Sequence, residues 1–453
     1  MKIFNDRKFY SNLFKIALPI MLQYLIVSSL NMVDTLMIGK VGEKEIAAVG
    51  IANQYFFFFN ILIGGVFSGC GMYISQFWGS RDEKNIRRVV GLGNVLGISL
   101  SLIFMVIAII NPEGIIRLFN SDKEVVILGS KYLSIVIYSY IFTAITFNYA
   151  FASRCIGNPK LPMIVSAIAL GTNTIFNYIL IFGHLGFNPM GVEGAAIATL
   201  IARIVEVISL ISIIYIKNGV LASKKEELLY FKKKFIKKMY RTIGAVVLNE
   251  ACWGLGTVLY SAVYGRISTE ALAAVQICNP ITNLFMVITF GISNAAIVMV
   301  GNKVGANEVE EAKDFAKKFL KLGCGIGILL AGVLALLSPT ILSFYSGDIS
   351  YEILKSAERI LYITSLILTI RTFNIILIVG VLRGGGDAKY GLFVEAFTMW
   401  CIGVPVSFLG AFVFKLNVEY VVTLITLEEV AKFILGYIRI KRGKWVKVLV
   451  SSM

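Results

Sequence analysis

The chain has 453 residues, of which 57% are hydrophobic and only 15% charged, and its mean hydropathy is +0.80. A soluble globular chain has about 45 to 50% apolar and about 25% charged residues, so the composition excludes that class and indicates a protein that crosses a membrane several times. The net charge of +16 would suit a nucleic-acid partner, but the basic residues gather in loops, which indicates membrane topology instead.

Twelve apolar segments are long enough to span a bilayer, which takes about 20 residues of helix. In chain order they are expected at residues 11–38, 46–78, 88–110, 124–152, 161–183, 191–216, 240–264, 271–300, 316–338, 352–382, 390–414 and 418–438. Short connections join them, apart from residues 217–240. The sequence therefore predicts an all-α polytopic membrane protein with twelve transmembrane helices.

The basic residues fix the expected orientation. With both termini in the cytoplasm, the inner loops and tails hold most of the Lys and Arg residues, as the positive-inside rule requires. The largest cluster, KNGVLASKKEELLYFKKKFIKKMYR (217–241), is interpreted as a cytoplasmic anchor; a site for lipid headgroups or a partner is the alternative. We expect an inner (cytoplasmic) membrane protein that contacts lipid and not nucleic acid.

An internal repeat runs through the sequence. The stretch GKVGEKEIAAVGIANQYFFFFNILIGG (39–65) aligns without gaps on GRISTEALAAVQICNPITNLFMVITFG (265–291). Later, RCIGNPK matches RGGGDAK as R-x-x-G-[N/D]-x-K. In these two segments we expect the glycine to permit a tight turn, Asn158 or Asp387 to cap the next helix, and the basic residues to anchor at headgroups.

The repeat predicts a six-helix bundle at 1–216, a basic cytoplasmic linker at 217–240 and a second six-helix bundle at 241–453. Because six is an even number, both bundles insert in the same orientation and are related by a pseudo-two-fold axis along the membrane normal. Parallel repeats around a midplane cleft are typical of transporters, which rock one bundle against the other.

One carboxylate, Asp34, lies in the middle of the first apolar span. A charge at the centre of a membrane helix costs about 2.5 to 3.5 kcal/mol on insertion scales, so such a residue usually faces a bundle interior or a water-filled cavity. Asp34 is therefore a candidate functional residue. The alternative is that it only forms a hydrogen bond to a neighbouring helix.

Several motifs, in this order, resemble one known family. They are VDT in the first span, GVEGAAIAT (191–199), LRGGGDAK (382–389) and RGKW (442–445). Together with the duplicated twelve-span pattern they resemble the multidrug and toxic compound extrusion (MATE) transporters over essentially the whole chain. The resemblance implies a monomeric antiporter without a cofactor, which exports cationic or amphipathic drugs and toxic compounds in exchange for H⁺ or Na⁺.

The resemblance also implies a coupling site in the first bundle. Asn173 and Asn177 share one helix face, and in the resembling proteins this face meets the first-span aspartate, with Thr199 in the same cluster. These oxygens could surround a proton or supply hard ligands for Na⁺. The aspartate would bind a drug cation when it is ionised and lose that attraction when it takes up a proton, so it would bind the two alternately.

In the second bundle the resemblance points to Glu250 as a possible second coupling acid. Relatives often pair it with a carboxylate where this chain has Thr372, so a sodium site built from two carboxylates cannot form in the same way. Arg371, which precedes Thr372 in the sequence, is either a counter-ion for Glu250 or a residue that snorkels to the membrane interface. Tyr138 and Tyr260 are candidates for substrate contact or gating, because aromatic faces attract cations.

Further charges within the predicted spans are expected to form structural pairs. They are Arg203 with Glu206 in span six, and Glu428, Glu429 and Lys432 in span twelve. Glu429 and Lys432 depart from the usual family sequence and could mark a substrate preference.

Other functions would leave different features in the sequence. A lipid-linked oligosaccharide or polysaccharide flippase of the same superfamily would need a cationic cleft for phosphates, and Lys and Arg are scarce within the spans. A membrane enzyme would need a convergent catalytic set, yet the chain has one histidine, and its six cysteines lack metal-ligand spacing. We therefore do not expect an enzyme, and a channel would not need two rocking halves.

Overall fold

A computed structural model describes residues 6–223, 227, 233–345 and 349–451. Part of the predicted basic linker, residues 224–226 and 228–232, lies outside this description. All regular secondary structure among the described residues is helical, as the hydropathy pattern predicts.

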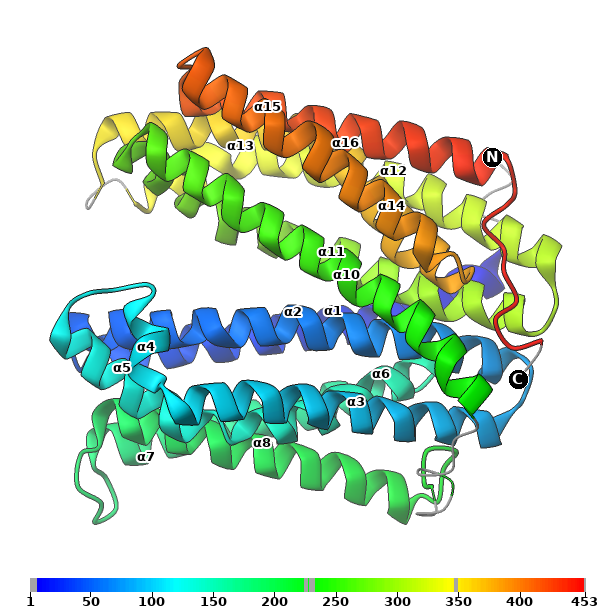
Figure 1. Cartoon of the computed structure of the whole chain (residues 1–453), viewed down its shortest axis with the longest axis horizontal. Helices are drawn as coiled ribbons and strands as arrows, with labels where there is room; N and C mark the ends of the chain where they lie inside the picture. Colours follow the sequence, from blue (N-terminus) through cyan, green and yellow to red (C-terminus); the bar gives the residue numbers. More distant parts are fainter. Residues whose placement is uncertain (1–5, 224–226, 228–232, 346–348, 452–453) are drawn as a thin grey trace. The chain divides into compact units, whose positions relative to one another are not determined.

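The helices are shown in chain order in Figure 1. Those of the first half are α1 (Arg7–Gly39), α2 (Glu43–Gly79), α3 (Glu83–Ile110), α4 (Pro112–Arg117), α5 (Lys123–Val136), α6 (Ser139–Cys155), α7 (Lys160–Phe182) and α8 (Gly191–Ile216). Those of the second half are α10 (Lys233–Ile267), α11 (Thr269–Gly305), α12 (Val309–Ser343), α13 (Tyr351–Ile375), η2 (Ile376–Leu382), α14 (Ala388–Thr398), η3 (Met399–Gly403), α15 (Val404–Phe408), η4 (Leu409–Val413) and α16 (Val418–Lys441). The η elements are π-helical turns that continue the α-helices beside them.

Each predicted span coincides with a helix or a run of joined helices. The fourth span is broken, because α5 and α6 meet at an angle of 51°. By length and composition, ten of the described helices could each cross a membrane, and this bent pair could form an eleventh. The twelfth predicted span, α16, does not meet that composition test because Glu428, Glu429 and Lys432 lie in its middle.

The described residues form two compact units, which are treated separately. The N-terminal unit consists of Leu18–Trp78 and Asp82–Ile243, and the C-terminal unit of Met1–Ala17, Gly79–Arg81 and Gly244–Met453. The first turns of α1 thus pack with the second half of the sequence.

In the N-terminal unit, α7 and α8 lie side by side (Figure 1). Their close approach requires a glycine at position 194, since a Cβ atom there would lie 2.7 Å from the backbone carbonyl group of Leu180. This contact explains why GVEGAAIAT consists largely of small residues: it lets α8 pack directly against the backbone of α7.

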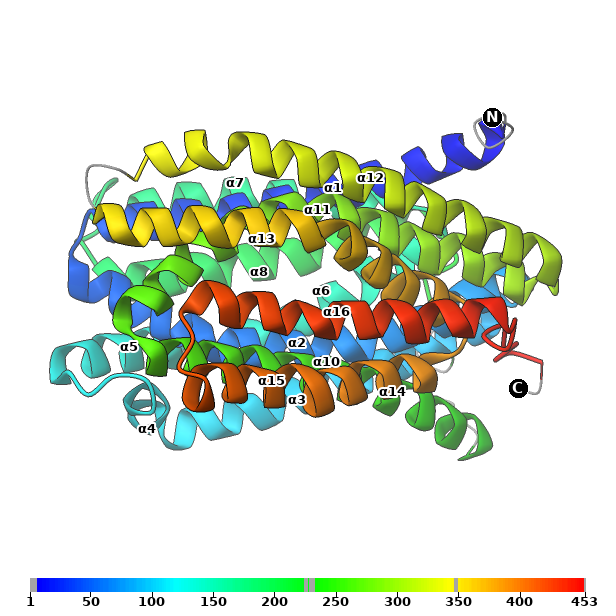
Figure 2. The same ribbon diagram turned by 90° about the horizontal axis from the view of Figure 1, so that it is seen from above.

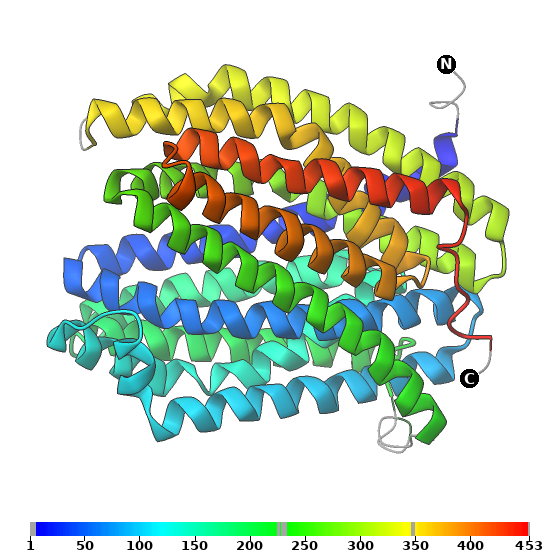
Figure 3. The same cartoon turned by 45° about the horizontal axis from the view of Figure 1, so that its top comes forward.

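In the C-terminal unit, α11 is buried along most of its length and packs against α12, α13 and η2. The helix α16 lies beside α14 and α15, as Figures 2 and 3 show.

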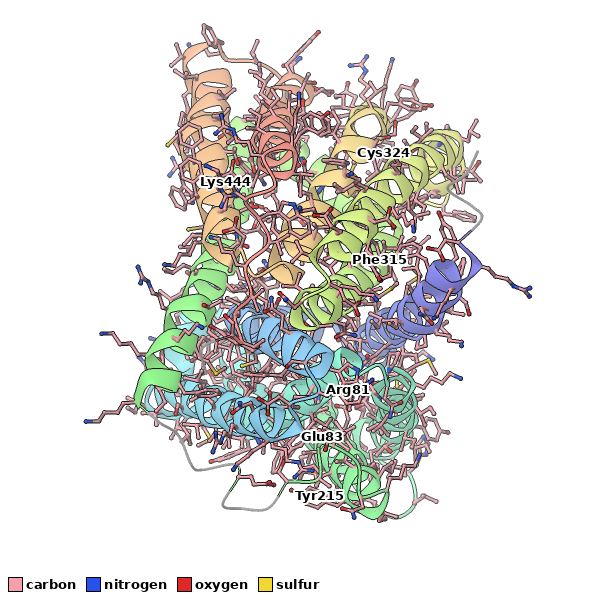
Figure 4. All side chains as sticks on the ribbon, turned by 90° about the vertical axis from the view of Figure 1, so that its right-hand side faces the viewer. Arg81, Glu83, Tyr215, Phe315, Cys324 and Lys444 are labelled. Carbon is pink, nitrogen blue, oxygen red and sulfur yellow. The ribbon has the colours of Figure 1, made fainter. Side chains whose placement is uncertain are left out.

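The start of α1 packs against α12 of the same unit. The ring of Phe9 lies 5.1 Å from that of Phe315 and 5.2 Å from that of Phe319, measured between centroids; Phe315 is labelled in Figure 4. Lys318 donates a 2.6 Å hydrogen bond to Asp6. Aromatic packing and an ion pair therefore hold the first turn of α1.

The R-x-x-G turns differ partly from their prediction. Gly157 and Gly386 have φ angles of 82° and 89°, a region that glycine tolerates best, so the tight turns are confirmed. The expected anchoring at headgroups is wrong for the arginines, because Arg154 and Arg383 are only 8% and 4% exposed.

The expected helix caps are also wrong. The helices that follow the two turns, α7 and α14, have no side-chain cap, so neither Asn158 nor Asp387 acts as one. Instead the buried carboxylate of Asp387 pairs with Arg439 at 2.7 Å and with Lys447 at 2.5 Å. The terminal segment packs on this turn, since Lys447 donates its backbone N–H to the carbonyl of Gly385 at 2.7 Å. Two ion pairs, from Arg439 at the end of α16 and from Lys447 in the terminal segment, thus hold this turn in place.

Candidate functional site

The N-terminal unit brings Asp34, Asn173, Asn177 and Thr199 together from α1, α7 and α8. Asn177 Nδ2 donates to Asp34 Oδ1 at 2.5 Å and to Asn173 Oδ1 at 3.0 Å. Asn173 Nδ2 in turn reaches Thr199 Oγ1 at 3.5 Å. The spacing of four residues on α7 aims both amides at the same point, which follows from the helical repeat.

The cluster offers oxygen atoms to a ligand. Asn173 and Asn177 are fully buried, while Asp34 and Thr199 are half-buried. Asn177 Oδ1 has no hydrogen-bond partner among the described residues, and leaving a buried acceptor unsatisfied costs about 1 to 3 kcal/mol. A hard cation such as Na⁺, or a proton on the Asp34 carboxyl group, would satisfy such oxygens. The donor set therefore fits the coupling ions that the resemblance implies.

Two further residues of the same unit approach this cluster. The hydroxyl group of Tyr132 on α5 lies next to Thr199 and close enough to Asp34 to feel its charge. Arg203 on α8 is also within electrostatic reach of Asp34. Sequence reasoning did not select Tyr132, because one tyrosine in an apolar span carries no distinctive pattern.

Arg203 and Glu206 form the predicted pair, with 2.7 Å between Nη1 and Oε2. The pair belongs to a longer buried chain of hydrogen bonds. Ser166 donates to Glu206 at 3.1 Å, Gln23 donates to Ser166 at 3.0 Å, and Arg154 donates to Gln23 at 2.6 Å. Polar contacts thus connect the first R-x-x-G turn to the surroundings of Asp34.

The counter-ion of Glu250 is Arg383, at 2.6 Å, and not Arg371. Arg383 also donates to Asn249 Oδ1 at 2.7 Å. The repeat register places Asn249 opposite Gln23, and Arg154 opposite Arg383. Both R-x-x-G arginines therefore bind the equivalent amide oxygen of their own unit, but among the described residues only Arg383 also pairs with an acid.

The remaining predicted residues lie in three different settings. Tyr138 occupies the break between α5 and α6 and is 48% exposed. Tyr260 is 9% exposed, and its hydroxyl group donates to Glu428. Arg371 is half-buried and acts electrostatically on Glu429. Tyr260 and Arg371 thus surround the charged residues of α16 and not Glu250.

Comparison with known proteins gives consistent results. The model of the MatE family matches residues 19–179 and 245–409, and the two matches begin at the offset that separates Gly39 from Gly265. The chain is 24% identical to the uncharacterized transporter YisQ of Bacillus subtilis, over 96% of this chain and 95% of that protein. It is also 25% identical to the probable multidrug resistance protein YoeA of B. subtilis (88% and 86% covered) and 24% identical to the probable multidrug resistance protein NorM of Thermotoga maritima (96% and 93%).

Solved structures share the fold. An outward-facing multidrug resistance MATE transporter of the MOP superfamily superposes with a TM-score of 0.87 at 18% identity, covering 96% of both chains. The Vibrio cholerae MATE transporter VcmN gives a TM-score of 0.88 at 18% identity, covering 98% of both. The family match extends over most of the sequence, and the fold agrees with it. The chain therefore belongs to the MATE family of membrane transporters.

Proposed function

We propose that this protein is a secondary active antiporter of the cell membrane that exports cationic or amphipathic compounds in exchange for H⁺ or Na⁺. The observation that carries the proposal is the Asp34 cluster: a carboxylate in a membrane helix beside a buried amide oxygen that lacks a donor in the described part of the chain. Two of the relatives compared above are named as probable multidrug resistance proteins, which supports this substrate class.

Coupling follows from competition for one carboxylate. Ionised Asp34, together with the oxygens of Asn173 and Asn177, attracts a cation. A bound proton or Na⁺ neutralises Asp34 and weakens its attraction for a cationic substrate. Alternating access of a monomer with both termini in the cytoplasm then exchanges one cation for the other. Tyr132 and Arg203 adjust the local field without occupying the carboxylate.

Asp34 is the principal coupling acid in this proposal, and Glu250 a possible second one. The reason is their different partners. Glu250 already has Arg383 as its counter-ion, whereas among the described residues Asp34 makes no ion pair within 4.0 Å and receives only an amide hydrogen bond. A carboxylate that no fixed cation contacts directly is free to bind a mobile one.

The test is dye efflux from proteoliposomes under an imposed pH gradient or Na⁺ gradient. The Asp34→Asn variant should lose gradient-driven efflux, because an amide cannot take up a proton and attracts a cation poorly. Asp314→Asn, the same change at an exposed position of α12, is the matched control and should transport normally. Undiminished efflux by Asp34→Asn would remove Asp34 from the coupling role. The gradient that drives wild-type efflux identifies the coupling ion.

The alternative, a lipid-linked flippase of the same superfamily, would carry anionic phosphates. A cluster of oxygen acceptors around Asp34 repels phosphate, so this geometry favours cationic substrates. A fluorescent lipid-phosphate translocation assay in the same liposomes distinguishes the two functions, and flipping without dye efflux would favour the alternative.

A further inference from the structure

A second group of buried charges lies in the C-terminal unit, far along the sequence from Asp34. The Lys432 cluster consists of Glu395 on α14 and of Glu428, Glu429 and Lys432 on α16. These two helices lie side by side in Figure 3. Lys432 Nζ lies 2.7 Å from Glu395, 2.6 Å from Glu428 and 4.0 Å from Glu429. Glu395, Glu428 and Lys432 are only 7%, 4% and 5% exposed. One ammonium group thus connects three carboxylates, of which Glu395 and Glu428 are buried and Glu429 is partly exposed, with 20% of its side chain accessible.

Other elements complete the surroundings. From α10, the hydroxyl group of Tyr260 donates to Glu428. From α13, Asn374 Nδ2 donates to Glu429 Oε2 at 2.7 Å, and Arg371 acts electrostatically on the same carboxylate. Two neutral titratable groups of α10 also face the cluster, Tyr264 toward Glu428 and Cys252 toward Glu395.

The charges of this cluster do not balance. Three carboxylates face two cations, Lys432 and Arg371, so that the fully ionised cluster carries one surplus negative charge. An uncompensated charge in a buried site is strongly unfavourable, and carboxyl groups escape it by taking up a proton. One additional proton makes the set neutral.

An independent observation points to the same ligand. Asn374 is 2% exposed, and its Oδ1 atom has no hydrogen-bond partner among the described residues. The amide group of Asn374 already faces Glu429 through its Nδ2 atom. A protonated carboxyl group has an O–H donor in addition to its acceptor oxygen. When the added proton of the cluster resides on Glu429, its O–H group can donate to Asn374 Oδ1, which lacks a donor among the described residues.

We propose that the Lys432 cluster is a proton-binding site that holds one exchangeable proton, separate from the one at Asp34. A metal cation fits less well, because the Lys432 ammonium group already occupies the positions next to Glu395 and Glu428 and would repel it. The carboxylates interact closely, so the proton belongs to the cluster and not to one residue. A contribution to coupled export rests on the proposed antiport, whereas proton binding itself does not.

The test is infrared difference spectroscopy of the purified full-length protein in lipid nanodiscs, recorded between acidic and alkaline buffer. The readout is the carbonyl band of protonated carboxylic acids. All variants carry Asp34→Asn and Glu250→Gln, which remove both coupling acids of the proposed antiport. This background should retain a carboxylic-acid band. Adding Glu395→Gln or Glu429→Gln should remove the band, since either change abolishes the surplus charge. Adding Lys432→Met should enlarge it, because the cluster then needs two protons.

The matched control is Glu419→Gln, the same change on α16 at a residue that pairs with Ser356 and Arg359 outside the cluster; it should leave the band unchanged. Circular dichroism checks that each variant is folded. A band that survives both Glu395→Gln and Glu429→Gln would overturn the proposal, as would a smaller band in Lys432→Met. Loss of the band on adding NaCl at constant pH would assign the cluster to a metal cation instead. These outcomes do not depend on transport, so they are distinct from a failure of the proposed antiport.

Discussion

The two equivalent arginines of the repeat should differ in their importance for stability. Arg383 is 4% exposed and binds both Asn249 and Glu250. Removing one partner of a buried ion pair costs about 3 to 5 kcal/mol, and because the Glu250 side chain is 24% exposed, the lower end of that range applies. We expect Arg383→Met to reduce the free energy of unfolding by about 3 kcal/mol.

Arg154→Met supplies the comparison. Arg154 donates to Gln23 but forms no ion pair within 4.0 Å in the described part of the chain, so its loss leaves a neutral acceptor without a donor. That costs about 1 to 3 kcal/mol, a range whose upper end only reaches the cost expected at Arg383. The variants are compared by equilibrium unfolding in mixed micelles of SDS and a mild detergent, followed by circular dichroism.

A double variant separates the ion pair from simple packing. Replacing a whole buried pair with apolar residues is often neutral, so Arg383→Met combined with Glu250→Met should be more stable than Arg383→Met alone. The reasoning would be refuted by equal losses in Arg383→Met and Arg154→Met, or by a double variant as unstable as the sum of its two single variants.

Two further predictions concern helix packing and the first helix. Gly194→Ala should destabilise the protein by about 1 to 3 kcal/mol, as overpacking does, because its new methyl group would meet the backbone of α7. The control Gly171→Ala lies on an open face of α7 and should leave the stability unchanged. Equal losses of stability in the two variants, in the same unfolding assay, would contradict this account. The hydrogen bond from Lys318, together with that from the backbone N–H of Phe9, holds the pKa of Asp6 below its ordinary value of 3.8. A lowered pKa stabilises the folded form above 3.8 and loses this effect as the pH falls further. Amide protection factors at the start of α1, which correct for the pH dependence of intrinsic exchange, should therefore fall below that pH. Lys318→Gln should weaken this pH dependence, and an unchanged profile in the variant would exclude the ion pair as its cause.

Hydropathy predicted the spans well because the bilayer demands apolar residues whatever the neighbouring helices are. It failed where local sequence carries no signal. The sequence next to Tyr138 does not predict the break between α5 and α6, since neither proline nor glycine occurs there. The buried cation of α16 is tolerated because Lys432 pairs with Glu428 on the same helix and with Glu395 on α14, and the second contact depends on packing.

The candidate site was only partly accessible from the sequence. Asn173 and Asn177 could be assigned to one helix face from their spacing, and the family resemblance supplied Asp34 and Thr199 as neighbours. The chain from Arg154 through Gln23 and Ser166 could not be predicted, since each contact joins residues at least 40 positions apart. Such contacts follow from how the helices pack.

The packing of the first turn of α1 has a consequence for the order of synthesis. Asp6 and its partner Lys318 are 312 residues apart in sequence. At about 5 to 20 residues per second, roughly 15 to 60 s of translation separate the appearance of these two residues. The beginning of the first helix is thus made first and acquires its native neighbours late, so Phe9 remains without the aromatic rings of α12 while most of the chain is inserted. A ribosome that stalls before α12 would leave this apolar end of the nascent protein uncovered.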